Sequence, residues 1–357
     1  RAAHISDPQP IHSAQNRAKC QHRNMCQRGC PFGGYFSSNA STLPWAEKTR
    51  NMTLRPYSVV HSVVYDEAKK RAVGVHVVDA RTKEMTTYYA KIIFLNASAI
   101  NTNLILLNSR SNRFPNGLGN DSGMLGKAIG FHNYRGRVSA EYDGFYDSTT
   151  DGRRPNGAYI PRFRNVFKQE TDFLRGYAAS VSASKVPNPK NGLGEALKEG
   201  LFKPETGGWS IGAQMMGETL MKDTNQVSLD ASRKDDWGIP LLRMSVGFDD
   251  NDMKMVQDFY NEVSEMLHRA GFTNIKTSDT MRNPGSENHE MGGVRMGKDP
   301  KTSLLNRWNQ MHHCKNVFVT DGASMTSSST QNPSLTYMAL TARAVDYAVK
   351  EMKKGNI

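Results

Sequence analysis

The sequence predicts an α/β fold, α+β overall, in which one part is built on parallel strands and another on an antiparallel sheet. Two strand–turn–helix units indicate the parallel part. One is the apolar run Lys91–Leu95 before a helical Asn101–Asn108, and the other is Asn316–Thr320 before the long run of helix formers Ser334–Lys350. Residues 136–288 are rich in aromatic residues and Gly and contain strand-like pieces, which indicates the antiparallel part with helices on one face.

Composition limits the classes of protein that the chain can be. The 357 residues are enough for two domains, and 38% hydrophobic content with 30 Gly and 15 Pro suits a loop-rich α/β enzyme. The net charge of +12 is scattered and not clustered on one element, so we expect no nucleic-acid binding. No run of about 18 apolar residues occurs, so we expect no membrane span. No signal peptide is visible at Arg1.

The central elements follow from residue periodicity. Val-rich strands are expected at Tyr57–Tyr65 and Ala72–Asp79, with a third at Met85–Tyr89. The amphipathic run Asn251–Ala270 predicts a helix closed by Gly271. The Gly-rich link 115–132 has the wrong spacing for a dinucleotide fingerprint, and no strand leads into it, so it is expected to be a surface loop.

Three of the four cysteines lie close together near the start of the chain. Cys20, Cys26 and Cys30 are spaced C-x5-C-x3-C, and Cys314 stands alone. A disulfide framework would leave one thiol of the three over, and the CxxC pairs of a zinc finger are absent. Three thiolates on a short loop can hold an iron–sulfur cluster. Free or disulfide-paired cysteines remain the alternative.

The stretch from Asn288 to Thr336 contains the residues best suited to chemistry. His289 opens a Gly-rich turn, Asp321-Gly322 ends an apolar strand, and Asn332-Pro333 precedes a helix, with Asn expected as N-cap and Pro at the first helical position. A helix N-terminus at the carboxyl edge of a sheet stabilises an anion. A base such as His289 and an amide such as Asn332 can together hold a hydroxyl whose proton must leave.

These residues resemble the C-terminal signature of the glucose–methanol–choline (GMC) flavoprotein oxidoreductases. The signature is His-x-x-Gly-x-x-Arg-Met-Gly, then strand-Asp-Gly, then Asn-Pro-x-Leu-Thr, and the order and spacing of the three motifs agree. The resemblance implies that His289 accepts the proton of the substrate hydroxyl. It also implies that Asn332 occupies the second catalytic position, which is His or Asn in the family. Gly293 departs from the family, which usually has Thr there.

The resemblance implies FAD as the cofactor. It gives the cofactor six binding residues: Val60, Ser98, Asp321, Gly322, Asn332 and Pro333. The Val60 backbone would face adenine, Asp321 and Gly322 would lie beside the pyrophosphate and ribityl chain, and Asn332-Pro333 would lie under the flavin pyrimidine edge. Asn96 and Ser98 stand where the family usually has Ala and Gly, so a close approach of the backbone is less favoured there.

The cysteine stretch is similar to that of the catalytic subunits of bacterial FAD-dependent sugar dehydrogenases, a branch of the same family. This similarity implies a 3Fe-4S cluster held by Cys20, Cys26 and Cys30, which passes electrons from the flavin to a haem subunit. The implied partners are a sugar or other alcohol substrate, a small subunit and a cytochrome c electron acceptor. The implied location is the bacterial periplasm, with the cytoplasm as the alternative.

Four segments are expected along the chain. They are a Cys-rich cluster region at 1–50, a segment of the FAD domain at 51–135, the substrate domain at 136–288, and a C-terminal segment of the FAD domain at 289–357. The strand–GxGxxG–helix unit that seats the ADP part of FAD in this family is absent. The resemblance therefore covers roughly the last two thirds of a family member. We expect this polypeptide alone to bind FAD poorly and to be inactive, which a flavin absorbance spectrum tests.

Taken together, the sequence predicts an FAD-dependent dehydrogenase that oxidises a hydroxyl of a sugar, glycoside or sugar acid and passes electrons to an external acceptor. The enzyme alternative is a GMC oxidase that uses O2, with structural cysteines. The non-enzyme alternative is an inactive fragment that acts as a binding or electron-transfer module.

Overall fold

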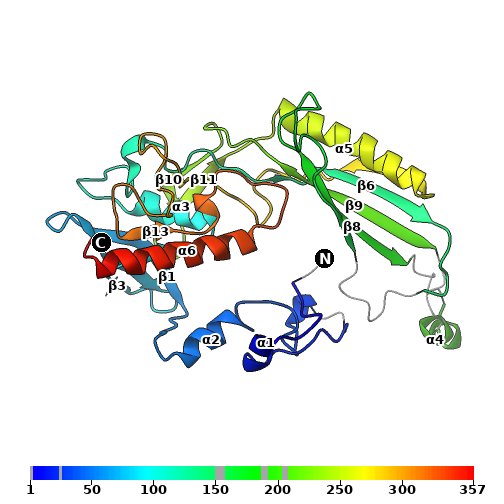
Figure 1. The fold of residues 1–357 in the computed structure, drawn as a ribbon, viewed down its shortest axis with the longest axis horizontal. Coiled ribbons are helices and arrows are strands. Elements are labelled where there is room, and N and C mark those ends of the chain that lie inside the picture. Colours follow the sequence, from blue (N-terminus) through cyan, green and yellow to red (C-terminus); the bar gives the residue numbers. More distant parts are fainter. Residues whose placement is uncertain (1–2, 24–25, 149–156, 186–191, 203–207) are drawn as a thin grey trace.

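The computed structural model describes residues 3–23, 26–148, 157–185, 192–202 and 208–357. Two bodies of secondary structure lie side by side along the longest axis, and the N-terminal segment with its short helices lies beneath them (Figure 1). Each body has its own buried apolar core. The fold is therefore mixed α/β with two sheet systems, as the sequence predicts.

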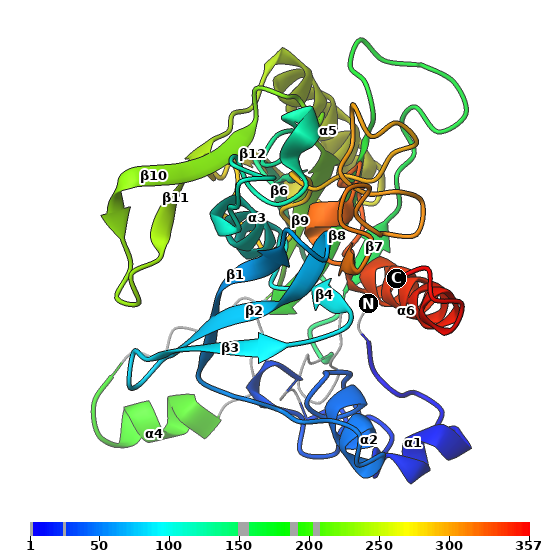
Figure 2. The same cartoon turned by 90° about the vertical axis from the view of Figure 1, so that its left-hand side faces the viewer.

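The first body combines an antiparallel meander with a short parallel pair of strands. The parallel pair is β4 with β13, so segments more than two hundred residues apart in sequence form one sheet. Figure 2 shows the meander, β1 to β3, curving beside β4. The elements are β1 (Ser58–Asp66), β2 (Arg71–Asp79), β3 (Met85–Tyr89), β4 (Ile93–Leu95), α3 (Ala99–Asn108), β13 (Val317–Val319), η3 (Gly322–Ser324) and α6 (Ser334–Lys353).

The second body is a six-stranded antiparallel sheet with α5 packed on one face (Figure 1). Its strand order is β12-β6-β9-β8-β7, and β5 pairs with β9. The buried side chains of Phe259 on α5 and Tyr177 on the sheet meet edge to face, with centroids 5.5 Å apart. The elements are β5 (His132–Asn133), β6 (Gly136–Tyr142), β7 (Ala158–Ile160), β8 (Tyr177–Lys185), β9 (Trp209–Glu218), α5 (Asp250–Arg269) and β12 (Thr273–Asp279).

The remaining elements are short. They are α1 (Pro10–Ala14), η1 (Cys26–Arg28), α2 (Thr42–Lys48), η2 (Asn120–Ser122), α4 (Glu195–Phe202), and the antiparallel pair β10 (Gln226–Lys234) and β11 (Pro240–Ser245). Within the described residues, no helix has the length and apolar character needed to cross a bilayer.

The strands and helices expected from periodicity are confirmed, including the parallel pairing of the Lys91–Leu95 run and the helix at Asn251–Ala270. The expectation of a surface loop at 115–132 is wrong. Leu118, Ile129 and Phe131 are fully buried there. The link passes between the two bodies, where its backbone bonds to the His289 turn, with Gly126 N donating to Gly293 O at 2.9 Å.

Candidate functional site

Asp321 holds together the two turns at the carboxyl edge of the parallel strands. The Thr102 hydroxyl on α3 donates to Asp321 Oδ2 at 2.6 Å, and the Ala323 amide donates to Oδ1 at 3.0 Å. Burial raises the pKa of this carboxyl, although Thr102 and the amides of Ala323 and Ser98 oppose the rise. Ser98 adopts φ +70°, which turns its amide toward the carboxylate. The structure thus brings Ser98 and Asp321 together at this edge, and their predicted contact with a cofactor stays a prediction.

The turn that follows His289 is packed tightly against the Asp321-Gly322 turn. A Cβ on Gly322 would lie 2.6 Å from the Glu290 carbonyl oxygen, so no side chain fits there. Gly293 adopts φ +86°, and a Cβ there would lie 2.2 Å from Asn103 Oδ1. The amide of Asn103 therefore fills the space that a side chain at position 293 would take. This packing explains why Gly replaces the usual Thr.

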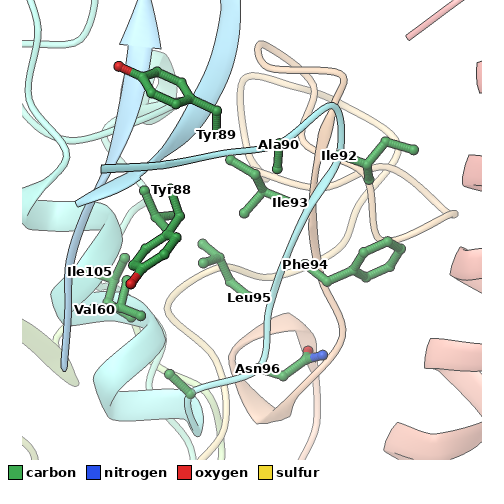
Figure 3. Close-up of a pocket in the computed structure, with 12 residues that line it drawn as sticks. Val60, Tyr88, Tyr89, Ala90, Ile92, Ile93, Phe94, Leu95, Asn96 and Ile105 are labelled. Atoms are coloured by element: carbon green, nitrogen blue, oxygen red, sulfur yellow. The ribbon is translucent and has the colours of Figure 1, made fainter. Parts of the chain in front are cut away.

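Val60 lies in an apolar groove beside β4 (Figure 3). The groove has a volume of about 510 Å³. Val60, Tyr88, Leu95 and Ile105 line it, and Asn96 and Ala97 carry it to the carboxyl end of β4 (Figure 3). The backbone that reaches Ser98 therefore starts at the end of this groove. The predicted role of Val60 in binding adenine stays a prediction.

His289 is half-buried, and its Nδ1 is buried with no hydrogen-bond partner among the described residues. Burial lowers the pKa of this imidazole, so its neutral form is favoured. The His132 ring meets it edge to face, with centroids 5.0 Å apart and planes at 86°. Burial raises the pKa of the nearby Glu287 to about 8. The surroundings of His289 thus suit a base that is neutral before the reaction.

A strap, residues 325–333, links η3 to α6 and is tied to the antiparallel sheet. The Ser327 hydroxyl donates to the buried Glu218 carboxylate on β9, and the Tyr159 hydroxyl on β7 donates to the Thr330 carbonyl. Backbone groups of the strap at Ser329 and Gln331 also lie near the His132 imidazole on β5. The sheet, the strap and His289 therefore meet around His132.

A polar pocket of about 380 Å³ borders the strap. Glu218 and Ser327 line it together with Arg175 and Arg295. Arg175 Nε lies 3.7 Å from Glu218 Oε1, a long ion pair that leaves both groups capacity for further hydrogen bonds. Mixed guanidinium, carboxylate and hydroxyl groups of this kind suit a hydroxylated ligand.

Asn332 does not cap α6 as the sequence predicts. Pro333 is the N-cap, in the αR conformation, and no side chain caps this helix. The reason is that the helix begins one residue later than expected, so Pro333 takes the cap position and Asn332 is left exposed before it. Pro333 is buried, and its carbonyl accepts from the Tyr337 amide at 3.1 Å. The convergence of Asn332 with His289 stays a prediction, because only the strap that leads to Asn332 is shown to reach the His132–His289 pair.

The three N-terminal cysteines are partly buried, and no disulfide joins the cysteines that the structure describes. Burial raises the pKa of the Cys30 thiol, but the backbone amides of Tyr35, Phe32, Gly34 and Gly33 lower it overall. Within the described ranges, no three His, Cys, Asp or Glu side chains are placed to hold a metal ion. Nothing in this arrangement supports a cluster at Cys20, Cys26 and Cys30, so the cluster stays a prediction that iron analysis tests.

Three residues at the site were not expected from the sequence. His132 ended a link that has no motif, Asn103 lay within an ordinary helix, and Glu218 ended a strand. Only the long-range pairing of β5 with β9, which sets His132 opposite Glu218, brings two of them to the strap. Gly293 was the sequence feature that could have indicated the position of Asn103. A residue without a side chain leaves space that a neighbouring side chain can fill.

Comparison with known proteins agrees with this geometry. Residues 9–132 and 222–341 both match the family described as GMC oxidoreductase. The chain is 31% identical to 2-methyl-1,2-propanediol dehydrogenase of Mycolicibacterium austroafricanum over 78% of its own length and 51% of the relative. It is 26% identical to the fructose dehydrogenase large subunit of Gluconobacter japonicus (97% and 63%) and to the gluconate 2-dehydrogenase flavoprotein of Pantoea cypripedii (87% and 54%). The chain thus spans 51% to 63% of the length of these relatives.

Solved structures support the fold. A formate oxidase superposes with a TM-score of 0.63 at 15% identity, covering 90% of this chain and 64% of that protein. Pyridoxine 4-oxidase from Mesorbium loti superposes with a TM-score of 0.55 at 13% identity, covering 91% and 63%. At these identities the likeness concerns the fold alone.

Proposed function

Because the chain belongs to the GMC oxidoreductase family, we propose that it supplies the catalytic base and part of the cofactor site of an FAD-dependent dehydrogenase. The proposed reaction is the oxidation of a hydroxyl of a sugar, glycoside or sugar acid. The observation that carries this proposal is the half-buried His289, whose lowered pKa favours the neutral ring and whose Nδ1 has no partner among the described residues, beside a strap that binds the antiparallel sheet.

The residues at the carboxyl edge of β4 and β13 fit a flavin cofactor. Ser98 and the Asp321-Gly322 turn lie together there, held by the bond from Thr102 to Asp321, and Asn103 Oδ1 is buried with no partner among the described residues. Ser98, Asp321 and Gly322 would hold the cofactor at this edge, and Val60 would lie at its adenine end. Bound FAD would supply an acceptor for the hydride equivalent that leaves the carbinol carbon.

His289 would take the proton of the substrate hydroxyl. Its Nδ1 is the buried nitrogen, so Nε2 is the atom that we assign to this proton. The lowered pKa keeps the ring unprotonated at neutral pH, which a general base requires. Asn332 would steady the substrate oxygen at the end of the strap.

The substrate class is inferred from two observations. The polar pocket beside the strap offers Arg175, Arg295, Glu218 and Ser327 to hydroxyl groups. Two relatives are named for fructose and for gluconate. A polyhydroxylated substrate satisfies such a lining better than a plain alcohol, because it offers several hydroxyl groups to these polar side chains.

An oxidase that reduces O2 is the second candidate. It is favoured by a relative named paromamine 6'-oxidase from Streptomyces fradiae, which is 25% identical over 93% of this chain. Anaerobic turnover with an artificial electron acceptor, compared with O2 consumption by the same preparation, separates the two. The electron route to an external carrier is likewise a proposal, and no step in it is assigned to the cysteines.

The test is a pair of substitutions in the natural protein. His289→Asn removes the base and keeps a polar side chain, so we expect kcat to fall by a factor of about 10² to 10⁴. Flavin absorbance should be unchanged, which shows that the cofactor site survives. His268→Asn changes an exposed histidine at the end of α5 and should keep native turnover. Full turnover in His289→Asn would refute the assignment of His289 as the base, and the absence of turnover in the native protein would favour a non-enzymatic role.

A further inference from the structure

The imidazole of His132 lies in a row of rings that begins at His289. On its other side, the Tyr134 ring meets it edge to face, with centroids 5.6 Å apart. The Arg282 guanidinium then lies 5.9 Å from the centroid of the Tyr134 ring. His132 is 1% exposed, and backbone groups of Gly217, Ser329 and Gln331 lie near its ring. A deeply buried imidazole in contact with a second imidazole influences how readily either ring takes a proton.

The backbone of His132 is fixed by the antiparallel sheet. β5 pairs with β9, where His132 lies opposite Glu218. The next residue, Asn133, donates from Nδ2 to the Asp252 carbonyl at 2.9 Å, which ties β5 to the start of α5. The ring is therefore presented by a rigid element, whereas His289 lies on a turn. Contact with the His132 ring therefore restricts the orientations that the His289 ring can adopt.

The charges around the pair decide which ring takes a proton. Glu287 and Glu290 lie on the turn of His289, Glu218 on β9 and Arg282 beside Tyr134. Burial, together with the proximity of His289, lowers the pKa of His132 to about 4. Two imidazoles at this distance do not both become protonated, so the more deeply buried His132 stays neutral.

We propose that His132 is a positioning residue for His289. Its neutral ring fixes the plane of the His289 imidazole and favours the protonated form that the base reaches during the reaction. The physical reason is that an edge-to-face pair orients both rings, and a neutral π face attracts a neighbouring cation. His132 itself takes no proton, since the proton from the substrate hydroxyl stays on His289. This inference rests on the proposed role of His289 as the base.

The test compares two variants that differ in aromaticity. His132→Phe keeps a neutral ring, and His132→Leu removes the ring while keeping an apolar side chain. In the natural holoenzyme we expect kcat to fall about fivefold in His132→Leu, the size that one aromatic pair contributes, with KM within twofold. His132→Phe should stay within twofold of native kcat. His268→Leu, at an exposed histidine, is the control.

A second readout does not depend on turnover. Histidine-selective NMR on the chain should show a lower pKa for His289 in His132→Leu than in the native protein, and a restored value in His132→Phe. The inference would be overturned if His132→Leu kept the native kcat and the native pKa of His289. It would also be overturned if kcat fell as far in His132→Phe as in His132→Leu. If leucine prevents folding, His132→Gln replaces it as the ring-free variant. Native turnover in His289→Asn would instead refute the proposed function, while the NMR comparison still decides the ring contact.

Discussion

The contact between Gly293 and Asn103 gives a prediction whose size follows from the structure. Gly293 adopts φ +86°, which costs a residue with a side chain about 1 to 2 kcal/mol. A Cβ there would also lie 2.2 Å from Asn103 Oδ1 and 2.3 Å from Nδ2, and overpacking of this kind costs about 1 to 3 kcal/mol. We therefore expect Gly293→Ala to lower the free energy of unfolding by about 3 kcal/mol.

Asn103→Ala acts on the same space from the other side. It removes bonds from Nδ2 to the Ala99 carbonyl at 2.8 Å and to the Gly292 carbonyl at 3.0 Å, each worth about 1 kcal/mol. It also removes the buried, unpaired Oδ1, which offsets part of that loss. The double variant Gly293→Ala/Asn103→Ala lacks the steric clash. Its loss in the free energy of unfolding should therefore be about 2 kcal/mol smaller than the sum of the losses in the two single variants.

Urea unfolding of the four proteins measures this coupling, with the slope m checked for constancy. Gly271→Ala is a matched control, because Gly271 has φ +82° and no atom lies within 4 Å of a Cβ built on it. It isolates the backbone strain and should be additive with Asn103→Ala. Coupling below about 0.5 kcal/mol between positions 293 and 103 would show that the packing argument is wrong.

Two further predictions concern pH. Because burial lowers the pKa of His132 from 6.5 to about 4, its contribution to stability is present above pH 6.5 and is lost as pH falls from 6.5 toward 4, by up to ~3 kcal/mol. His132→Phe should therefore lose less stability than the native protein over that range in urea titrations, and parallel curves would contradict this. Burial raises the pKa of Asp252 to about 7, so its ionised form is disfavoured in the folded state and native stability falls as pH rises from 4 toward 7. Asp252→Asn should gain Tm relative to the native protein between pH 5 and 8, whereas Asp250→Asn, at an exposed position of the same helical turn, should not.

The sequence by itself determined the local elements and the chemistry of the C-terminal motifs. Periodicity located α5 and β3, and a short apolar run before a turn identified β4 and β13 as parallel strands, because these signals depend only on neighbouring residues. The Gly-rich turn after His289 and the Asp321-Gly322 turn were recognised for the same reason. The family comparisons confirm the class of protein that these motifs indicate.

Tertiary structure decided what the local pattern leaves open. The sequence favoured Asn332 as helix cap and a surface loop at 115–132, but the helix begins at Ser334 with Pro333 as its N-cap, and packing buries the loop between the two bodies. His132 had no motif, and it reaches His289 because the 115–132 link pairs with the turn after His289, where Gly130 and Met291 exchange backbone hydrogen bonds of 2.8 Å. Contacts of this kind join residues more than a hundred positions apart, so no local propensity encodes them and only the folded chain specifies them.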